Sequence, residues 1–215
     1  MKKQNNDSGI IITVAGAVLV LVLLALFFAF KSEPKADSSL LIRDDSYRST
    51  SDIKNVTMVE FADYQCPACG VAAPNIRKIV EEYRDKVTYI YRHFPLPQHT
   101  NALVAAEAAE AAGVQGKYWG MHELLYLKQN EWSDSADATS IFVDYAKDLG
   151  LNVDQFKADV ASQKYQSKIE RDVVDGNSLG VNSTPTIYLN GVKYNGSFGY
   201  DSLKSAVDSA ISKAK

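Results

Sequence analysis

The spacing of apolar residues changes several times along the chain, and each pattern predicts a different element. The first apolar run, Gly9 to Phe30, contains no charged residue. At about 1.5 Å per residue, a helix of this run can cross a hydrocarbon core of about 30 Å. The run is longer than the apolar region of a cleavable signal peptide, and Ala29-Phe30-Lys31 offers no small-x-small cleavage site. We expect an uncleaved transmembrane signal anchor at residues 9–30, after a cytoplasmic N-terminus at residues 1–8.

The next segment, residues 31–53, is polar and contains Glu33-Pro34 with scattered Ser and Asp. This composition is typical of a linker between a membrane anchor and a folded domain. Leu40-Leu41-Ile42 interrupts the polar pattern. These residues could form a short edge strand or rest on the surface of the domain.

From residue 54 the pattern becomes that of an α/β domain. Val56–Ala62 is rich in β-branched and apolar residues and predicts a strand, and Val87–Tyr91 predicts a second. Between them, Ile76, Ile79, Val80 and Tyr83 recur at helical spacing. The three elements predict a right-handed βαβ unit with parallel strands. Pro74 should kink this helix rather than end it.

The middle of the chain predicts a helical insertion at about residues 99–176, and the tail returns to strands. Asn190-Gly191 is a strong signal for a two-residue hairpin turn. The chain from residue 54 to 215 therefore predicts one domain with the order βαβ, helical insertion, ββα. The expected helices are Ala102–Ala112, Tyr118–Leu127, Ala138–Leu149, Val153–Ser162, Tyr165–Val174 and Tyr200–Ala214, and the expected hairpin strands are Thr186–Leu189 and Val192–Tyr194.

The charge pattern excludes one class of partner. The formal net charge is −3, and no basic run occurs along the chain. Nucleic-acid binding depends on clustered Lys and Arg that contact phosphates. We therefore expect no nucleic-acid partner.

The candidate chemistry lies in Cys66-Pro67-Ala68-Cys69, which contains the only two cysteines of the chain. The motif follows the first predicted strand, and Pro67 suits the first turn of a helix. Cys66 should therefore lie near the N-cap, where free N–H groups and the helix dipole stabilise a thiolate. Cys69 falls on the same helical face and can close a disulfide. The motif indicates thiol–disulfide chemistry.

Two other interpretations of the cysteines carry less weight. A structural zinc site would need two more ligands, and the three histidines, His93, His99 and His122, are scattered. A purely structural disulfide would close a very short loop and restrict the unfolded chain little. We expect neither a metal nor a cofactor.

Three segments together resemble the bacterial DsbA-like thiol:disulfide oxidoreductases of the thioredoxin superfamily, which are membrane-anchored or secreted. The resemblance extends from about Val56 to the C-terminus and implies a thioredoxin-like fold. The segments are Val59-Glu60-Phe61-Ala62-Asp63-Tyr64-Gln65-Cys66-Pro67-Ala68-Cys69, Tyr91-Arg92-His93-Phe94-Pro95-Leu96 and Val181-Asn182-Ser183-Thr184-Pro185-Thr186-Ile187.

The resemblance implies roles for individual residues. Cys66 matches the exposed attacking cysteine of the family, and Cys69 matches its buried resolving partner. Pro185 matches a cis-proline that faces the CxxC motif, and Thr184 would contact the substrate. Glu60 matches a buried acid that moves protons to or from Cys69. Strand alternation alone leaves an exposed or edge-facing Glu60 as the alternative.

The remaining candidate residues are expected to have supporting roles. Pro67 and Ala68 should tune the stability of the Cys66 thiolate, and we expect an intermediate thiolate pKa and a moderately oxidising protein. His93 and His99 should have loop or capping roles after the second strand. His122 should be a half-buried packing residue on a helix.

The leading functional hypothesis is the oxidation of cysteine pairs in exported proteins, with re-oxidation by a membrane quinone-coupled partner. Disulfides persist outside the cytoplasm, so the domain should lie on the extracytoplasmic side of the cell membrane, anchored by a single span. A reductase or isomerase on the same scaffold is the nearest alternative. A third hypothesis is a client-binding module whose cysteines form an inert disulfide.

Overall fold

The computed structural model describes residues 35–50 and 52–214. The cytoplasmic N-terminus at residues 1–8 and the anchor at residues 9–30 lie outside these residues and stay predictions. Within the described ranges, no helix is both long and apolar enough to span a bilayer. Residues 35–215 form one compact unit.

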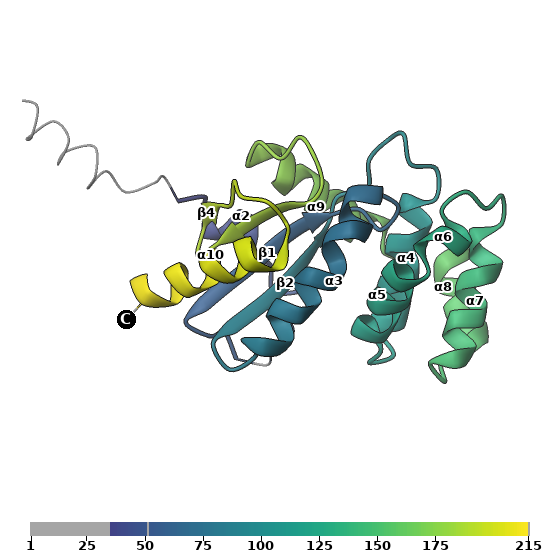
Figure 1. Ribbon diagram of the computed structural model, residues 1–215. Coiled ribbons are helices and arrows are strands. Elements are labelled where there is room, and N and C mark those ends of the chain that lie inside the picture. Colours follow the sequence, from purple (N-terminus) through teal and green to yellow (C-terminus); the bar gives the residue numbers. More distant parts are fainter. Residues whose placement is uncertain (1–34, 51, 215) are drawn as a thin grey trace, which may run out of the picture. The chain divides into compact units, whose positions relative to one another are not determined.

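A four-stranded sheet of order β2-β1-β3-β4 is the centre of this unit (Figure 1). The first two strands pair in parallel, with Val56 opposite Val87, and β3 runs antiparallel to β1, with Ile187 opposite Glu60. Positive φ angles at Asn190 and Gly191 complete the predicted hairpin turn between β3 and β4. The strands are β1 Val56–Ala62, β2 Val87–His93, β3 Thr186–Leu189 and β4 Val192–Lys193.

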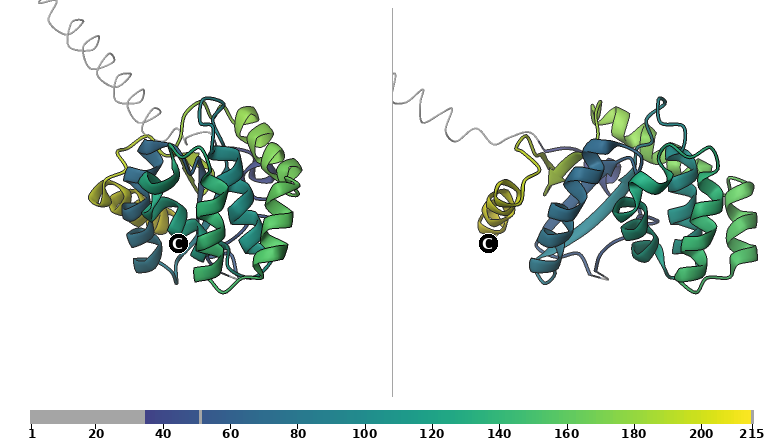
Figure 2. Two further views of the ribbon diagram at one scale, coloured as in Figure 1. Left: turned by 90° about the vertical axis from the view of Figure 1, so that its right-hand side faces the viewer. Right: turned by 45° about the vertical axis from the view of Figure 1, so that its right-hand side comes forward.

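Helices cover the sheet and extend beyond it. Figures 1 and 2 show α4 to α8 of the insertion gathered beyond the edge of the sheet that carries β2, with α10 toward the other edge. The parallel strands are joined by α3, which continues through Pro74. The helices are α2 Ser38–Leu41, α3 Pro67–Glu82, α4 Ala102–Gly113, α5 Tyr118–Leu127, α6 Gln129–Trp132, α7 Ala138–Asp148, α8 Val153–Ala161, α9 Gln166–Ser178 and α10 Tyr200–Lys213.

The two faces of the sheet have separate hydrophobic cores, so both are covered. Residues of β1 alternate between the cores: Met58 and Ala62 belong to the core under α3, α10 and the insertion, whereas Val59 and Phe61 belong to the core under α2 and α9. Because Glu60 lies on the same side as Met58, it faces the interior beneath α3. A half-exposed sheet would have placed this carboxylate in water.

The structure differs from the expected linker at residues 31–53, because residues 36–50 pack against the domain. Residues 38–41 form the helical turn α2 and not an edge strand, and Leu41 is buried. The Ala36 N–H donates to the Gly191 carbonyl at 2.8 Å. The buried Arg92 guanidinium donates to the carbonyls of Leu40 and Leu41 at 2.9 and 2.8 Å. These bonds attach the segment to the turn between β3 and β4 and to β2, which lie toward opposite edges of the sheet.

Candidate active site

The turn after β1 places Cys66 at the N-terminus of α3. Cys66 is the N-cap residue, and Pro67 occupies the first turn, as the sequence predicts. The Asp63 carboxylate accepts the Gln65 N–H at 2.7 Å and holds the turn. From α6, a helix that the sequence analysis did not predict, Gln129 donates its side-chain amide to the carbonyls of Tyr64 and Cys66 at 2.6 and 3.0 Å. The insertion therefore helps to position the cysteine loop.

The environment of Cys66 favours its thiolate. A hydrogen bond from the Cys69 thiol lowers the pKa of Cys66 to about 5 against the opposing effect of burial. The backbone N–H groups of Cys69 and Ala68 add to the effect. These N–H groups are the unpaired donors of the first helical turn. A pKa of about 5 lies in the middle of the range of about 3.5–7.5 for activated cysteines, which agrees with the intermediate value expected from the sequence.

The loop before β3 faces Cys66 from the other side. The Thr184–Pro185 peptide bond is cis, and the Cys66 thiol donates to the Thr184 carbonyl at 3.5 Å. The Thr184 hydroxyl is buried and has no partner in the described part of the chain. Thr186 donates its hydroxyl to the Ser183 carbonyl at 2.8 Å and fixes the loop. Residues from two segments that are far apart in the sequence therefore meet at the Cys66 sulfur.

Cys69 and Glu60 form the buried part of the site. Their exposed fractions are 0% and 2%, so the expected burial of Glu60 is confirmed. Burial raises the pKa of Glu60 to about 7, although the hydroxyl of Tyr89 donates a hydrogen bond to its carboxylate. Burial, the hydrogen bond to Cys66 and the charge of Glu60 raise the pKa of Cys69 far above its usual range. Cys69 is therefore a thiol at neutral pH, and its neighbour Glu60 can carry a proton near that pH.

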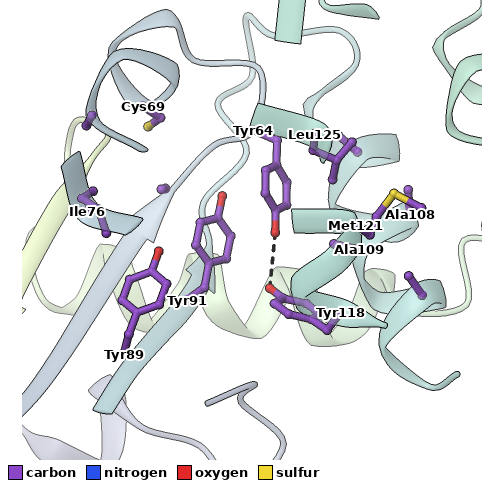
Figure 3. Close-up of a cluster of buried hydrophobic side chains, with 14 of the residues drawn as sticks. Tyr64, Cys69, Ile76, Tyr89, Tyr91, Ala108, Ala109, Tyr118, Met121 and Leu125 are labelled. Carbon is purple, nitrogen blue, oxygen red and sulfur yellow. Dashed lines mark hydrogen bonds between the residues drawn. The ribbon is translucent and has the colours of Figure 1, made fainter. Parts of the chain in front are cut away.

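Aromatic side chains surround Glu60 and Cys69. Figure 3 shows Tyr89 and Tyr91 projecting from β2 on the side of Cys69 and Ile76, with Tyr64 between Tyr91 and the insertion residues Met121 and Leu125. The hydroxyl of Tyr91 forms a hydrogen bond with that of Tyr126 on α5 at 2.8 Å. These tyrosines were not identified from the sequence. Their period of two along β2 is the signal that could have found them.

A cavity of about 290 Å³ reaches Glu60 between α3 and α5. Its wall contains Tyr89, Trp119 and His122, and its rim contains the exposed Arg77 and Glu81. Glu60 therefore has a route to the surface that does not pass Cys66. Proton exchange between a buried carboxylate and solvent requires such a route or a chain of polar groups.

The histidines have structural partners. His99 lies in the loop between β2 and α4, as expected, and its Nδ1 forms a hydrogen bond to the Asp63 carboxylate at 2.6 Å. His93 is the last residue of β2, so its expected loop position is wrong, and its Nε2 lies 2.9 Å from the Glu110 carboxylate. His122 is half-buried, as expected, and its Nδ1 lies 3.0 Å from the Tyr64 hydroxyl. Burial lowers the pKa of His122 to about 3.

The surface beside Cys66 is apolar. Pro67 and Ala68 are exposed, and together with Val71 and Phe198 they line a shallow hollow of about 500 Å³. Val71 is 76% exposed. Among residues 35–50 and 52–214, no group of three or more His, Cys, Asp or Glu side chains is arranged to hold a metal ion.

The fold and the CxxC geometry define a thioredoxin-type protein. The chain matches the model of the thioredoxin family over residues 54–209, so it belongs to that family. A thioredoxin-like oxidoreductase from Silicibacter pomeroyi superposes with a TM-score of 0.69 at 27% identity, covering 82% of this chain and 99% of that one. Alpha-DsbA1 from Wolbachia pipientis gives 0.72 at 25% identity, with 82% and 96% covered. Its fold is thus similar to those of DsbA-type proteins of the thioredoxin superfamily.

Sequence relatives show the same domain in a larger context. The Na(+)/H(+) antiporter NhaA 3 of Salinispora tropica is 40% identical over 161 residues, which is 74% of this chain and 24% of that protein. NhaA 1 of Salinispora arenicola is also 40% identical, over 73% of this chain and 23% of its own length. The chain spans about a quarter of the length of these curated relatives.

Proposed function

We propose that this protein is a thiol–disulfide oxidoreductase that oxidises cysteine pairs of exported proteins through Cys66 and Cys69. The observation that carries the proposal is the contrast between the two cysteines. Cys66, which is 7% exposed, has a pKa of about 5 at a helix N-terminus, whereas Cys69 has no exposed surface and a strongly raised pKa. One sulfur is suited to exchange with a substrate, and the other to resolving the intermediate.

The exchange begins from the Cys66–Cys69 disulfide. A substrate thiolate attacks the sulfur of Cys66, a substrate–Cys66 bond forms, and Cys69 leaves with the electron pair. Glu60 gives Cys69 a proton. The second substrate thiolate then attacks the substrate sulfur of the mixed disulfide, and Cys66 leaves as a thiolate. The substrate loses two electrons and gains a disulfide, while the protein gains two electrons and becomes a dithiol.

The low pKa of Cys66 supports this direction. A thiolate that is stable at neutral pH is a good leaving group, and its stability favours the reduced form of the protein. A protein whose reduced form is stabilised is an oxidant of other thiols. Regeneration needs an acceptor of two electrons, for which we propose a quinone-coupled partner in the membrane. The reductase is the alternative direction on the same two sulfurs.

Substrate contacts are proposed at two places beside Cys66. The apolar hollow at Pro67, Ala68 and Val71 offers a surface for unfolded chains, which expose apolar side chains. Thr184 offers a backbone carbonyl and an unpartnered hydroxyl next to the sulfur. An extended peptide that pairs with the backbone before Pro185 would bring its cysteine to Cys66.

We propose that the domain works on the extracytoplasmic side of the cell membrane, held by an anchor at residues 9–30. Disulfides made by the protein persist there. No antiporter activity is proposed, because the chain matches only about a quarter of the antiporters.

The test of direction is the reduction potential of the Cys66–Cys69 couple, measured by equilibrating residues 35–215 with glutathione buffers. A potential between about −120 and −180 mV supports a disulfide donor. A potential near about −270 mV, that of thioredoxin, contradicts the oxidase and favours the reductase. If the parent forms no mixed disulfides with clients and the Cys66→Ala variant binds clients as the parent does, the client-binding module is favoured instead.

A further inference from the structure

The cavity between α3 and α5 has an aromatic wall. The rings of Tyr89 and Trp119 lie 5.5 Å apart by their centroids, those of Trp119 and His122 5.2 Å, and those of His122 and Tyr126 5.3 Å. The Trp119 indole N–H donates to the Arg48 carbonyl at 3.1 Å and fixes this ring. The first pair is tilted and the other two are edge-to-face, and aromatic walls bind flat apolar groups and attract cations.

Above about pH 7 the charge inside the cavity is negative, because Glu60 is then ionised. Glu60 uses one carboxylate oxygen to accept from Tyr89, and its other oxygen has no hydrogen-bond partner among the described residues. His122 adds no positive charge, because burial lowers its pKa to about 3. The inner end of the cavity is therefore a carboxylate oxygen of Glu60 that accepts no hydrogen bond from the described residues.

The rim adds to this charge. Glu81 and Glu123 both line the cavity. The only cationic residue among the lining side chains, Arg77, lies 3.1 Å from the Glu81 carboxylate and 3.9 Å from that of Glu123. Arg77 is thus already paired, and the lining carries an excess of carboxylates. A ligand that enters should carry a positive charge to the unpaired oxygen at the inner end.

We propose that this cavity binds a small aromatic ammonium ion, with its ammonium group on the free carboxylate oxygen of Glu60 and its ring against Trp119. The volume of about 290 Å³ lies at the small end of ligand sites and suits a single ring with a short amine arm. The ligand site goes beyond the proposed thiol exchange and does not require it.

Calorimetric titration of the full-length chain with benzylamine at pH 8 tests the charge requirement, with benzyl alcohol as the neutral comparison. We expect saturable binding of benzylamine and at least tenfold weaker binding of benzyl alcohol. The Glu60→Gln variant should bind benzylamine at least tenfold more weakly and benzyl alcohol unchanged. The matched Glu170→Gln variant, on the exposed side of α9, should bind both as the parent does. Equal benzylamine binding by the parent and Glu60→Gln would overturn the proposal.

The two tryptophans locate the bound probe. Trp119 lines the cavity, whereas Trp132 is fully buried and donates its indole N–H to the Leu125 carbonyl. In NMR spectra of the parent chain, the indole signal of Trp119 should shift on adding benzylamine and that of Trp132 should stay. The signals are assigned with a Trp119→Phe variant. A shift of Trp132 alone, or of neither signal at saturation, would overturn the location.

A second readout separates this site from the proposed thiol exchange. If Glu60 both holds the ammonium and supplies protons to Cys69, saturating benzylamine should slow the formation of the mixed disulfide at Cys66, the step in which Cys69 leaves. Saturable binding with an unchanged rate supports the ligand site and contradicts the proton-transfer role of Glu60. Absent binding overturns the ligand site and leaves the thiol exchange to its own test.

Discussion

Replacing Glu60 by Gln should change how stability depends on pH. Glu60 lies beneath the cysteines with an exposed fraction of 2%, and burial raises its pKa from 4.5 to about 7. Glutamine has the same shape, can accept the hydrogen bond from Tyr89, and does not ionise. The substitution therefore removes one buried titration while leaving the packing of the site almost unchanged.

The sign and size follow from the two pKa values. In the unfolded chain Glu60 ionises near pH 4.5, but in the folded chain only near pH 7. The contribution of Glu60 to the free energy of unfolding of the parent therefore falls as pH rises from 4.5 to 7, by about 1.36 kcal/mol per pH unit. The loss totals about 3 kcal/mol and is constant at higher pH. Relative to the parent, Glu60→Gln should gain this amount between pH 4 and pH 8.

Urea unfolding of both reduced proteins at pH 4, 6 and 8 measures the effect. With a slope of about 2 kcal/mol per molar urea, the difference between the two midpoints should grow by about 1.5 M from pH 4 to pH 8. The titration of Cys66 has the opposite sign, but it is present in both proteins and cancels in the difference. Glu170→Gln, which removes an exposed carboxylate, is the control. A midpoint difference independent of pH would refute the reasoning.

Three further outcomes are expected. The ultraviolet absorbance of the Cys66 thiolate should titrate near pH 5; a midpoint near 9 would contradict this. Cys69→Ser should accumulate mixed disulfides visible by mass spectrometry, while Cys66→Ser forms none, and equal trapping would contradict the assigned roles. Asp172→Ala should cost about 3–5 kcal/mol in urea unfolding, because it leaves the buried Arg92 guanidinium without one of its carboxylates. A cost below about 1 kcal/mol would show that this ion pair is not essential to the core.

The order of elements was largely predictable because its signals are local. The strand at Val56–Ala62, the helix at Tyr118–Leu127 and the turn at Asn190-Gly191 depend on residue type and spacing within a few positions. The position of Cys66 at the N-cap likewise follows from the strand before it and from Pro67 after it. Periodicity and capping depend on residues that are close together in the sequence, so a single sequence is enough to recognise them.

The surroundings of the cysteines depend on contacts between residues that are far apart in the sequence, and local sequence patterns do not reveal these contacts. Gln129 reaches the Cys66 carbonyl across 63 positions, and Arg92 holds the Leu40 carbonyl across 52. Partners this far apart are selected by the packing of the whole chain. The short helix α6 and the packed segment at residues 36–50 were missed for this reason.

The sequence by itself determined the cysteine motif, its place between strand and helix, and the α/β order of the domain. Only the tertiary structure decided that Glu60 is buried beside Tyr89, that a cavity reaches it, and that the pKa of Cys66 is about 5. The physical reason is that burial and electrostatic environment are properties of the assembled interior. A carboxylate in a strand has its ordinary pKa until the opposing helices remove it from water.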